Sequence, residues 1–368
     1  MKKIICLFVC FLMLFTMCSC QNEKDPIETK PQTTQGSTEA PSAPEIEIPD
    51  SVTDPAATQA PETEPITEPV TEPATEPATE PATEPATEPA TEPPTQPSTE
   101  PKPTDPPVSP DTPTSVTLEY SQHTYTVSDA HNVKGLSTVS KGFSYGVAKD
   151  GAPHAQSVIN QQTFDGFENV DALALDTKNQ GKIMYLTFDN GYEYENLTAD
   201  ILDTLKEKNV KAAFFITMSY AKNNPELVQR MINEGHIVGN HSTTHPSFPK
   251  LTRTQMAEEI AELDNYMREH FSYSSPYFRF PSGEYSECAL ELVSSMGFRS
   301  VFWSAAYADW DTSTQKGEEY AFSTVTSRFH PGAVILLHAV SQDNADALGR
   351  IIDEAHNQGY TFQTLDDY

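Results

Sequence analysis

Residues 183–193 read Ile-Met-Tyr-Leu-Thr-Phe-Asp-Asn-Gly-Tyr-Glu, an apolar run that ends abruptly in Asp189, Asn190 and Gly191. A strand that is buried on both faces reads as a continuous apolar run, and the Asn-Gly pair that follows is a strong turn signal. An acid and an amide therefore emerge at the carboxyl end of a buried strand. Open α/β sheets and barrels place their chemistry at this end.

The sequence after this stretch repeats the pattern of an apolar run followed by an amphipathic segment. The amphipathic segments keep apolar residues at i, i+3/i+4 spacing, which predicts helices. The six further runs are Ala212–Thr217, His236–Gly239, Tyr277–Phe280, Ser300–Trp303, Ala333–Leu337 and Tyr360–Thr364. This alternation predicts an α/β fold, either a parallel sheet or a distorted (β/α) barrel with about seven parallel strands. Thr252 and Gln255 predict a capping box at the start of one helix.

Composition divides the 368-residue chain into parts. Residues 21–114 are dominated by Thr, Glu, Pro and Ala, and from Glu62 Thr-Glu-Pro recurs with a four-residue period. Such a segment buries too little apolar surface to offset the entropy of ordering it, so we predict a disordered linker that its prolines extend. It is either a stiff spacer or a repeat of no set length. Residues 115–180 predict an N-terminal extension that packs on the α/β domain, which spans residues 181–368.

The first residues have the features of an export signal. Met1-Lys2-Lys3 and the apolar run Ile4–Phe15 match the charged start and short hydrophobic core of a secretory signal. The run is too short for a comfortable transmembrane span. The end, Met17-Cys18-Ser19-Cys20, resembles a bacterial lipobox, so residues 1–20 predict a lipoprotein-type signal peptide with lipid on Cys20. Acylation there would tether the protein to the outer face of the cell membrane, outside the cytoplasm; ordinary cleavage and release is the alternative.

Charge and cysteine content restrict the classes of partner. The net charge is −30, and residues 1–114, with 20 acids and 5 bases, carry half of it. The remaining domain is equally acidic and is a poor candidate for binding nucleic acid, because phosphate contacts need clustered Lys and Arg. Four of the five cysteines precede residue 21 and only Cys288 follows, so no disulfide can form within the domain.

Two histidines follow the strand predicted at residues 236–239. The spacing His241-Ser-Thr-Thr-His245 lets two imidazoles converge on one cation. Surface or helix-capping histidines are the alternative reading of such a pair. The position at the carboxyl end of a strand favours metal ligands.

Three further charged side chains lie in or after other predicted strands. His338 ends the most apolar run of the domain, so it is either a proton donor that faces the site or a satisfied core residue. Asp309 follows another strand, and a carboxylate near His338 would raise its pKa and keep it protonated. Arg279 lies inside an apolar run, where a charge needs a partner, and Asp189 is the expected one.

Five segments occur in the order of the five motifs of the polysaccharide deacetylase family, the NodB-homology group or carbohydrate esterase family 4. They are Thr187–Gly191, His241–His245, Arg279–Pro281, Asp309-Trp310 and Leu336–His338. The sequence from about residue 181 to 368 therefore resembles this family. The resemblance implies a distorted (β/α) barrel and metal-dependent removal of acetyl groups from N-acetylated or O-acetylated sugars.

The resemblance also implies roles for the charged residues. Asp189 would be the general base and His338 the general acid. Asp309 would tune His338, and Arg279 would orient Asp189. Amide hydrolysis needs such a pair, because one group takes a proton from water and the other gives one to the leaving amine.

The remaining matches concern the metal and the substrate. His241, His245 and Asn190 would bind a divalent metal, for which zinc is expected. The metal would polarise the attacking water and the acetyl carbonyl. The backbone N–H of Ser282 is the expected oxyanion donor, and Trp310 is expected to contact substrate.

The sequence departs from the family pattern in two places. The usual second aspartate of the first motif, a metal ligand, is Asn190 here. An amide oxygen still coordinates, but one formal charge is lost and the affinity for a divalent metal should fall. A bound metal would keep more positive charge and acidify its water more. The first acid of the usual fourth motif is replaced by Ala306.

The Asp-Asn-Gly variant, residues 302–304 and residues 337–345 resemble the subgroup of muramic-acid deacetylases that lead to muramic δ-lactam, and this resemblance extends upstream through residues 142–146. This implies that the substrate is peptidoglycan N-acetylmuramic acid without its stem peptide. A chitooligosaccharide or xylan deacetylase remains an alternative, as does a glycan-binding pseudoenzyme in which Asn190 marks a lost metal site. The retained acids and bases argue against the pseudoenzyme, because a pure binder needs no acid–base pair.

Overall fold

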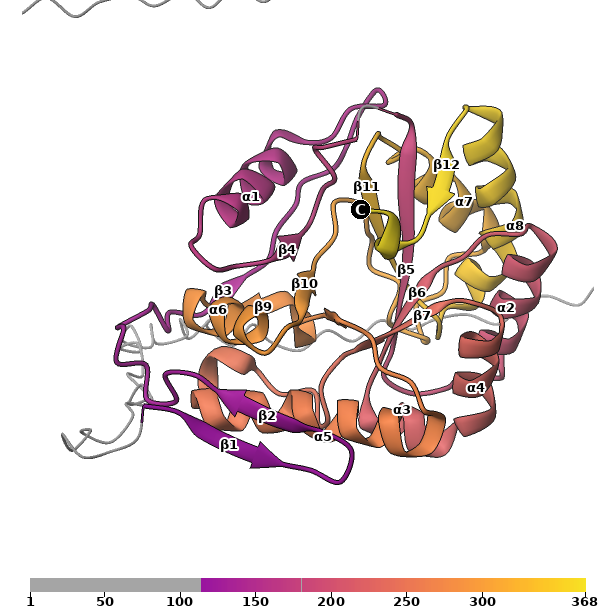
Figure 1. Cartoon of the computed structure of the whole chain (residues 1–368). Coiled ribbons are helices and arrows are strands. Elements are labelled where there is room, and N and C mark those ends of the chain that lie inside the picture. Colours follow the sequence, from indigo (N-terminus) through magenta and orange to yellow (C-terminus); the bar gives the residue numbers. More distant parts are fainter. Residues whose placement is uncertain (1–113, 180) are drawn as a thin grey trace, which may run out of the picture. The chain divides into compact units, whose positions relative to one another are not determined.

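The computed structural model describes residues 114–179 and 181–368, whose arrangement Figure 1 shows. The central element is an eight-stranded parallel sheet in the order β11-β5-β6-β7-β8-β10-β4, and β12 pairs with the first residues of β5. Its strands are β4 Ala172–Leu173, β5 Ile183–Asn190, β6 Ala213–Ile216, β7 Ile237–Asn240, β8 Tyr277–Phe278, β10 Arg299–Val301, β11 Ala333–His338 and β12 Thr361–Gln363. The sheet curls, and an isolated bridge between Ala305 and Ile335 joins its two sides. This confirms the predicted distorted barrel.

Eight α-helices are present in the described part of the chain. They are α1 Ala155–Asp165, α2 Leu197–Glu207, α3 Met218–Asn223, α4 Pro225–Asn233, α5 Arg253–Phe271, α6 Glu287–Ser295, α7 Glu318–Thr326 and α8 Gln342–Asn357. The predicted capping box begins α5, where the Thr252 side chain accepts the N–H of Gln255 and the Gln255 side chain accepts the N–H of Thr252. None of these helices is long and apolar enough to cross a membrane.

The two faces of β5 show why its residues have different surroundings. Tyr185 belongs to the small apolar cluster that fills the inside of the barrel, whereas Met184, Leu186 and Phe188 belong to the larger cluster under the helices. Side chains alternate along a strand with a period of two. Asp189 therefore shares the inner face with Tyr185, and the next residue lies on the helix-facing side.

The segment 114–179 adds two short antiparallel pairs and one strand of the main sheet. The hairpin of β1 Val116–Glu119 and β2 Thr124–Val127 contacts α5 (Figure 1). The two-residue strand β3 Lys141–Gly142 pairs with β9 Glu284–Tyr285, and β4 pairs with β10. This segment was predicted as an extension that packs on the barrel, but β4 makes it part of the sheet.

Gln161 explains how a strand as short as β4 is held. This buried side chain accepts the N–H of Ala174 at 2.8 Å and donates to the carbonyl of Ala172 at 3.0 Å. A side chain thus supplies hydrogen bonds that a neighbouring strand would otherwise provide. The predicted signal peptide, lipid anchor at Cys20 and linker up to residue 113 lie outside the described residues.

Candidate active site

A cavity of about 900 Å³ opens at the carboxyl ends of the barrel strands. Six of the residues singled out from the sequence line it: Asp189, His241, His245, Ser282, Trp310 and His338. Arg279 and Asp309 lie directly behind this lining, where they contact Asp189 and His338. Asn190 does not line the cavity. The structure therefore gathers residues from the ends of five strands, β5, β7, β8, β10 and β11, into one pocket.

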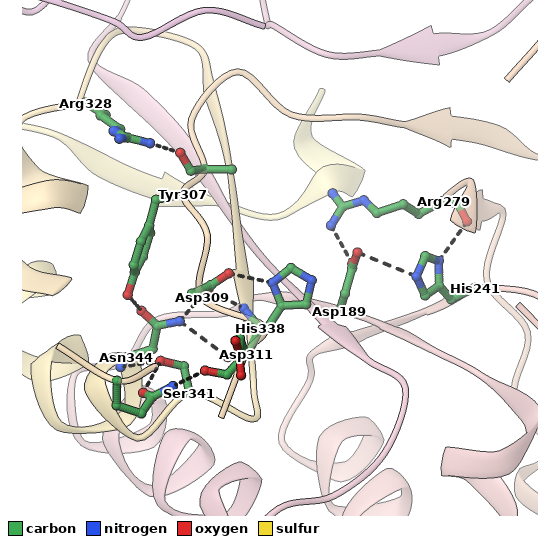
Figure 2. Close-up of polar contacts among 12 residues, drawn as sticks. Asp189, His241, Arg279, Tyr307, Asp309, Asp311, Arg328, His338, Ser341 and Asn344 are labelled. Carbon is green, nitrogen blue, oxygen red and sulfur yellow. Dashed lines mark hydrogen bonds and ion pairs between the residues drawn. The ribbon is translucent and has the colours of Figure 1, made fainter. Parts of the chain in front are cut away.

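Asp189 is held by a buried guanidinium. The Arg279 Nη1 donates to Asp189 Oδ1 at 2.8 Å (Figure 2). Arg279 Nη2 donates to Thr187 Oγ1 at 2.9 Å. Arg279 is fully buried and lies over the Phe215 ring, 4.1 Å from its centroid. This confirms that Arg279 and Asp189 are partners. Such a pair fixes the carboxylate geometrically and also sets its charge.

The charge state of Asp189 follows from its surroundings. Burial alone would raise the pKa of Asp189, but the charge of Arg279, with a smaller contribution from His241, outweighs it and holds the pKa below its ordinary value. Asp189 is therefore ionised at neutral pH. An ionised carboxylate at a cavity wall is ready to accept a proton from water.

His241 is oriented as a ligand or acceptor. Its Nδ1 lies 2.8 Å from the carbonyl of Arg279, and its Nε2 lies 3.6 Å from Asp189 Oδ2 (Figure 2). A carbonyl only accepts, so Nδ1 carries the proton and the lone pair of Nε2 is left toward the cavity. Burial lowers the pKa of His241 to about 4, although Asp189 opposes the shift. The ring is thus neutral at pH 7.

His245 meets His241 through an irregular turn, not through a helix. Ser242 and His245 have positive φ values of 69° and 59°, and the His245 N–H donates to Ser242 Oγ at 3.0 Å. The two imidazole rings lie 4.8 Å apart between centroids, nearly perpendicular to each other. This confirms that the pair converges at the strand end.

Asn190 lies on the opposite face of β5, next to α2 and α3. It is fully buried, and its Nδ2 donates to Thr198 Oγ1 at 3.3 Å. Thr198 in turn donates to Glu193 Oε2 at 2.5 Å, and the Tyr220 hydroxyl lies 3.0 Å from the same oxygen. The Oδ1 of Asn190 is buried and has no hydrogen-bond partner among the described residues. An orphaned buried oxygen is costly, so this atom has spare capacity to bind a ligand.

These donors fit a divalent metal in their chemistry. Two imidazoles and an amide oxygen that has no partner among the described residues are three ligands of the kinds that divalent ions accept. None of the three is a carboxylate, and in residues 114–179 and 181–368 no three His, Cys, Asp or Glu side chains lie close enough to hold a metal. The set therefore lacks the carboxylate that would strengthen binding.

His338 stands beside Asp189 on the neighbouring strand. The two residues are register partners of the parallel strands β11 and β5. Asp309 Oδ1 lies 2.7 Å from His338 Nδ1, and Asp309 Oδ2 accepts the backbone N–H of His338 at 2.8 Å. Burial alone would lower the pKa of His338, but the hydrogen bond and charge of Asp309 outweigh it and raise the pKa above its ordinary value. His338 is thus a proton donor that stays charged close to neutral pH.

The cavity walls are aromatic and partly unforeseen by the sequence. Trp310 is 59% exposed at the rim, with its ring 5.9 Å from that of His338. Ser282 has a φ of 55°, and a side chain at Gly283 would meet Trp303 at 2.8 Å, so this turn packs tightly against the wall. Tyr145, from the 114–179 segment, also lines the cavity and donates to the carbonyl of Ala306 at 2.6 Å. Tyr145 lies in the segment 142–146 of the subgroup resemblance, but sequence periodicity gives it no role, because that role depends on tertiary packing.

Replacing Asp309 with Asn should move the alkaline limit of activity to lower pH. His338 must be protonated to act as an acid, so activity is lost as the pH rises through its pKa. Asp309 raises that pKa; without its charge, the opposing effect of burial dominates and the pKa falls. We expect the rate at the optimum to drop about 10²-fold. The measurement is acetate release across a pH series, and an unchanged alkaline limb would show that Asp309 does not tune the acid.

Comparisons with known proteins agree with this geometry. Residues 176–301 match the family model described as polysaccharide deacetylase. The chain is 42% identical over 204 residues to the peptidoglycan-N-acetylmuramic acid deacetylase PdaA of Bacillus subtilis, covering 54% of this chain and 76% of the relative. It is 35% identical over 189 residues to a peptidoglycan-N-acetylglucosamine deacetylase of Bacillus cereus, covering 49% of this chain and 66% of the relative.

A solved structure is also similar. The structure described as Bacillus subtilis PdaA, a family 4 carbohydrate esterase, matches with a TM-score of 0.58 and 36% identity. The match covers 63% of this chain and 97% of that structure.

Proposed function

The chain belongs to the polysaccharide deacetylase family, carbohydrate esterase family 4, and on this premise we propose that it removes the N-acetyl group of N-acetylmuramic acid in peptidoglycan without stem peptides. The family membership makes it a hydrolase of N-acetyl amide bonds, and its relatives make peptidoglycan the substrate class. One observation carries the catalytic proposal. An ionised Asp189 and a protonated His338 face one cavity from adjacent strands. A pseudoenzyme that only binds glycan would not need this acid–base pair.

The proposed reaction uses each member of the pair once. Asp189 takes a proton from the attacking water as oxygen bonds to the acetyl carbon, and Arg279 keeps the carboxylate charged and aimed. His338 then gives its proton to the sugar nitrogen as the carbon–nitrogen bond breaks and acetate leaves. Ser282 lines the cavity, and its backbone N–H is the proposed donor to the oxyanion.

A divalent metal, for which zinc is expected, completes the proposal. His241, His245 and Asn190 would hold it, and when bound it would polarise the water and the acetyl carbonyl. The neutral, pre-oriented ring of His241 and the unpartnered oxygen of Asn190 support this role. The loss of one carboxylate predicts weaker binding than a site with an aspartate at this position.

The choice of muramic acid rests on the resemblance of residues 187–193, 302–304 and 337–345 and on the name of the 42% identical relative. Removal of the acetyl group frees an amine that can close on the lactyl carboxylate and form a δ-lactam. A second relative is named for N-acetylglucosamine, so the sugar must be tested directly. Peptide-free glycan strands, chitooligosaccharides and acetylated xylan are incubated with the protein, and products are identified by mass spectrometry.

We expect acetate from peptide-free strands, with deacetylated muramic acid or its lactam among the fragments. Acetate released only as deacetylated glucosamine, or only from chitooligosaccharides or xylan, would overturn the muramic-acid assignment but not the deacetylase. A further proposal concerns location, namely lipid on Cys20 and anchoring to the outer face of the cell membrane. Recovery of a Cys20→Ala variant in the membrane fraction together with wild type would contradict it.

A further inference from the structure

A buried chain of hydrogen bonds lies behind the proton donor. Asp309 is buried, and within the described residues His338 is the only cation with which it forms an ion pair. Its Oδ2 accepts two N–H groups, the backbone of His338 at 2.8 Å and the Nδ2 of Asn344 at 2.6 Å. Asn344 Oδ1 in turn accepts the hydroxyl of Tyr307 at 2.6 Å (Figure 2). The sequence gives Tyr307 no signal, and Asn344 lies in the segment 337–345 of the subgroup resemblance without a role assigned to it.

The direction of each bond in this chain follows from its two ends. An ionised carboxylate only accepts, so the atom of Asn344 that faces Asp309 must be its NH₂ group. The Asn344 oxygen then faces Tyr307, whose hydroxyl donates to it. Tyr307 thereby fixes which way the amide of Asn344 points, and an amide turned the other way would place oxygen against oxygen at Asp309.

The position of Asn344 in α8 keeps the amide in place. Ser341 is the N-cap of this helix, and its hydroxyl accepts the N–H of Asn344 at 3.3 Å. The Nδ2 of Asn344 also lies 3.4 Å from the carbonyl of His338. One amide therefore links the first turn of α8 to both residues of the acid pair. Asn344 is 1% exposed, so solvent does not supply a substitute donor.

We propose that Asn344, oriented by Tyr307, is a positioning residue. It holds the Asp309 side chain in the rotamer that hydrogen-bonds to His338. Asp309 binds His338 at two points, the ring Nδ1 and the backbone N–H. Both contacts form only when the carboxylate group has one particular orientation. Asn344 donates a third N–H to the carboxylate, and this bond stabilises that orientation. With Nδ1 held by Asp309, His338 presents its Nε2 to the substrate. This inference rests on the proposed acid role of His338.

Three charged groups bear on His338 from different elements. Asp309 follows β10, Asp189 ends β5 and Arg279 follows β8. Of these three, Asp309 forms the printed ring contact, and Asn344 contacts only Asp309 among them. A change at Asn344 should therefore act on the His338 ring through Asp309 and leave the environment of Asp189 intact.

The test uses Asn344→Leu, which keeps the approximate volume of the side chain but removes the donor. We expect kcat to fall about 10- to 100-fold, the range for loss of a hydrogen bond to a charged group, with KM within about twofold of wild type. The alkaline limb of the pH profile should move to lower pH, because a loosened Asp309 opposes the effect of burial less. Proton NMR should also show loss of the downfield Nδ1–H resonance of His338.

Asp343→Ala is the matched control. Asp343 lies in the same turn of α8, where its Oδ2 accepts the N–H groups of Lys316 at 2.6 Å and Gly317 at 2.9 Å. This variant frees the first turn of α8 from residues 316–317 without touching Asp309, so the alkaline limb and the Nδ1–H resonance should match wild type. An equal shift in both variants would mean that Asn344 only supports the helix, and would overturn the proposal.

Two further outcomes separate this inference from the proposed function. If Asn344→Leu does not fold, Tyr307→Phe takes its place. This variant keeps the ring but frees the Asn344 amide to turn. It should move the alkaline limb of the pH profile to lower pH and weaken the Nδ1–H resonance of His338. If a folded Asn344→Leu protein keeps the alkaline pH limb and the His338 Nδ1–H resonance of wild type, the positioning role is contradicted. If wild type releases no acetate at all, the proposed function fails, and the resonance alone still decides whether Asn344 holds Asp309.

Discussion

Replacing Asp189 with Asn should lower the rate of acetate release at least about 10³-fold, the scale of losing a general base. Asn keeps the shape of Asp189 and an oxygen for Arg279, but it cannot take a proton from water. The substitution also leaves a fully buried guanidinium without a counter-charge, and breaking a buried pair in this way costs up to about 3–5 kcal/mol. Acetate release and a thermal melt of the same preparation measure both effects.

Asp171→Asn is the matched control for this change. Asp171 also pairs with an arginine, Arg299, at 2.8 Å, but its side chain is 55% exposed. An exposed pair contributes about 0–1 kcal/mol, so this variant should melt close to wild type and keep full activity. Activity in a folded Asp189→Asn protein at more than a tenth of the wild-type rate would remove Asp189 from the mechanism.

Replacing Asn190 with Asp should tighten binding of zinc about tenfold or more. A carboxylate attracts a divalent ion more strongly than an amide oxygen does, and the proposed site otherwise contains no carboxylate ligand. Titration calorimetry with zinc alone, and metal content after dialysis, report affinity independently of activity. The new charge also approaches Glu193 through Thr198, so we expect a lower melting temperature in the absence of metal.

Two variants make the Asn190 measurement specific. Asn223→Asp adds the same charge on the exposed surface of α3, and its zinc affinity should equal that of wild type. His241→Ala should remove binding in both the wild-type and the Asn190→Asp backgrounds. Equal zinc affinities of Asn190→Asp and wild type would show that Asn190 is not a ligand, in keeping with its place outside the cavity lining.

The main strands could be predicted because each buries an apolar run of several residues. The elements that the sequence did not reveal carry little of this signal. β4 is only Ala172–Leu173 and depends on Gln161 for its hydrogen bonds, and the amphipathic pattern of α1 is weak because only Ser157, Gln161 and Phe164 of its residues are buried. Such elements form because the rest of the domain is already in place.

The candidate site divides in the same way. Asp189, His241 and His338 could be predicted because polar residues at strand ends share one edge of the barrel. The face on which Asn190 lies depends on the alternation of side chains along β5. Asp189 points into the barrel, so Asn190 points toward Thr198. The roles of Tyr307 and Asn344 could not be predicted, although Asn344 lies in the segment 337–345 of the resemblance, since each acts through a contact between segments more than 30 residues apart. Tertiary contacts of this kind leave no local pattern.

Acetate release from peptide-free glycan strands, measured on wild-type protein loaded with zinc and again after chelation, tests the central claim most directly. The account predicts steady release from the zinc-loaded protein, loss of release after chelation, and recovery when zinc returns. Equal release before and after chelation would contradict the metal site of His241, His245 and Asn190. No release under either condition would contradict the enzyme itself and leave a protein that binds glycan without cleaving it.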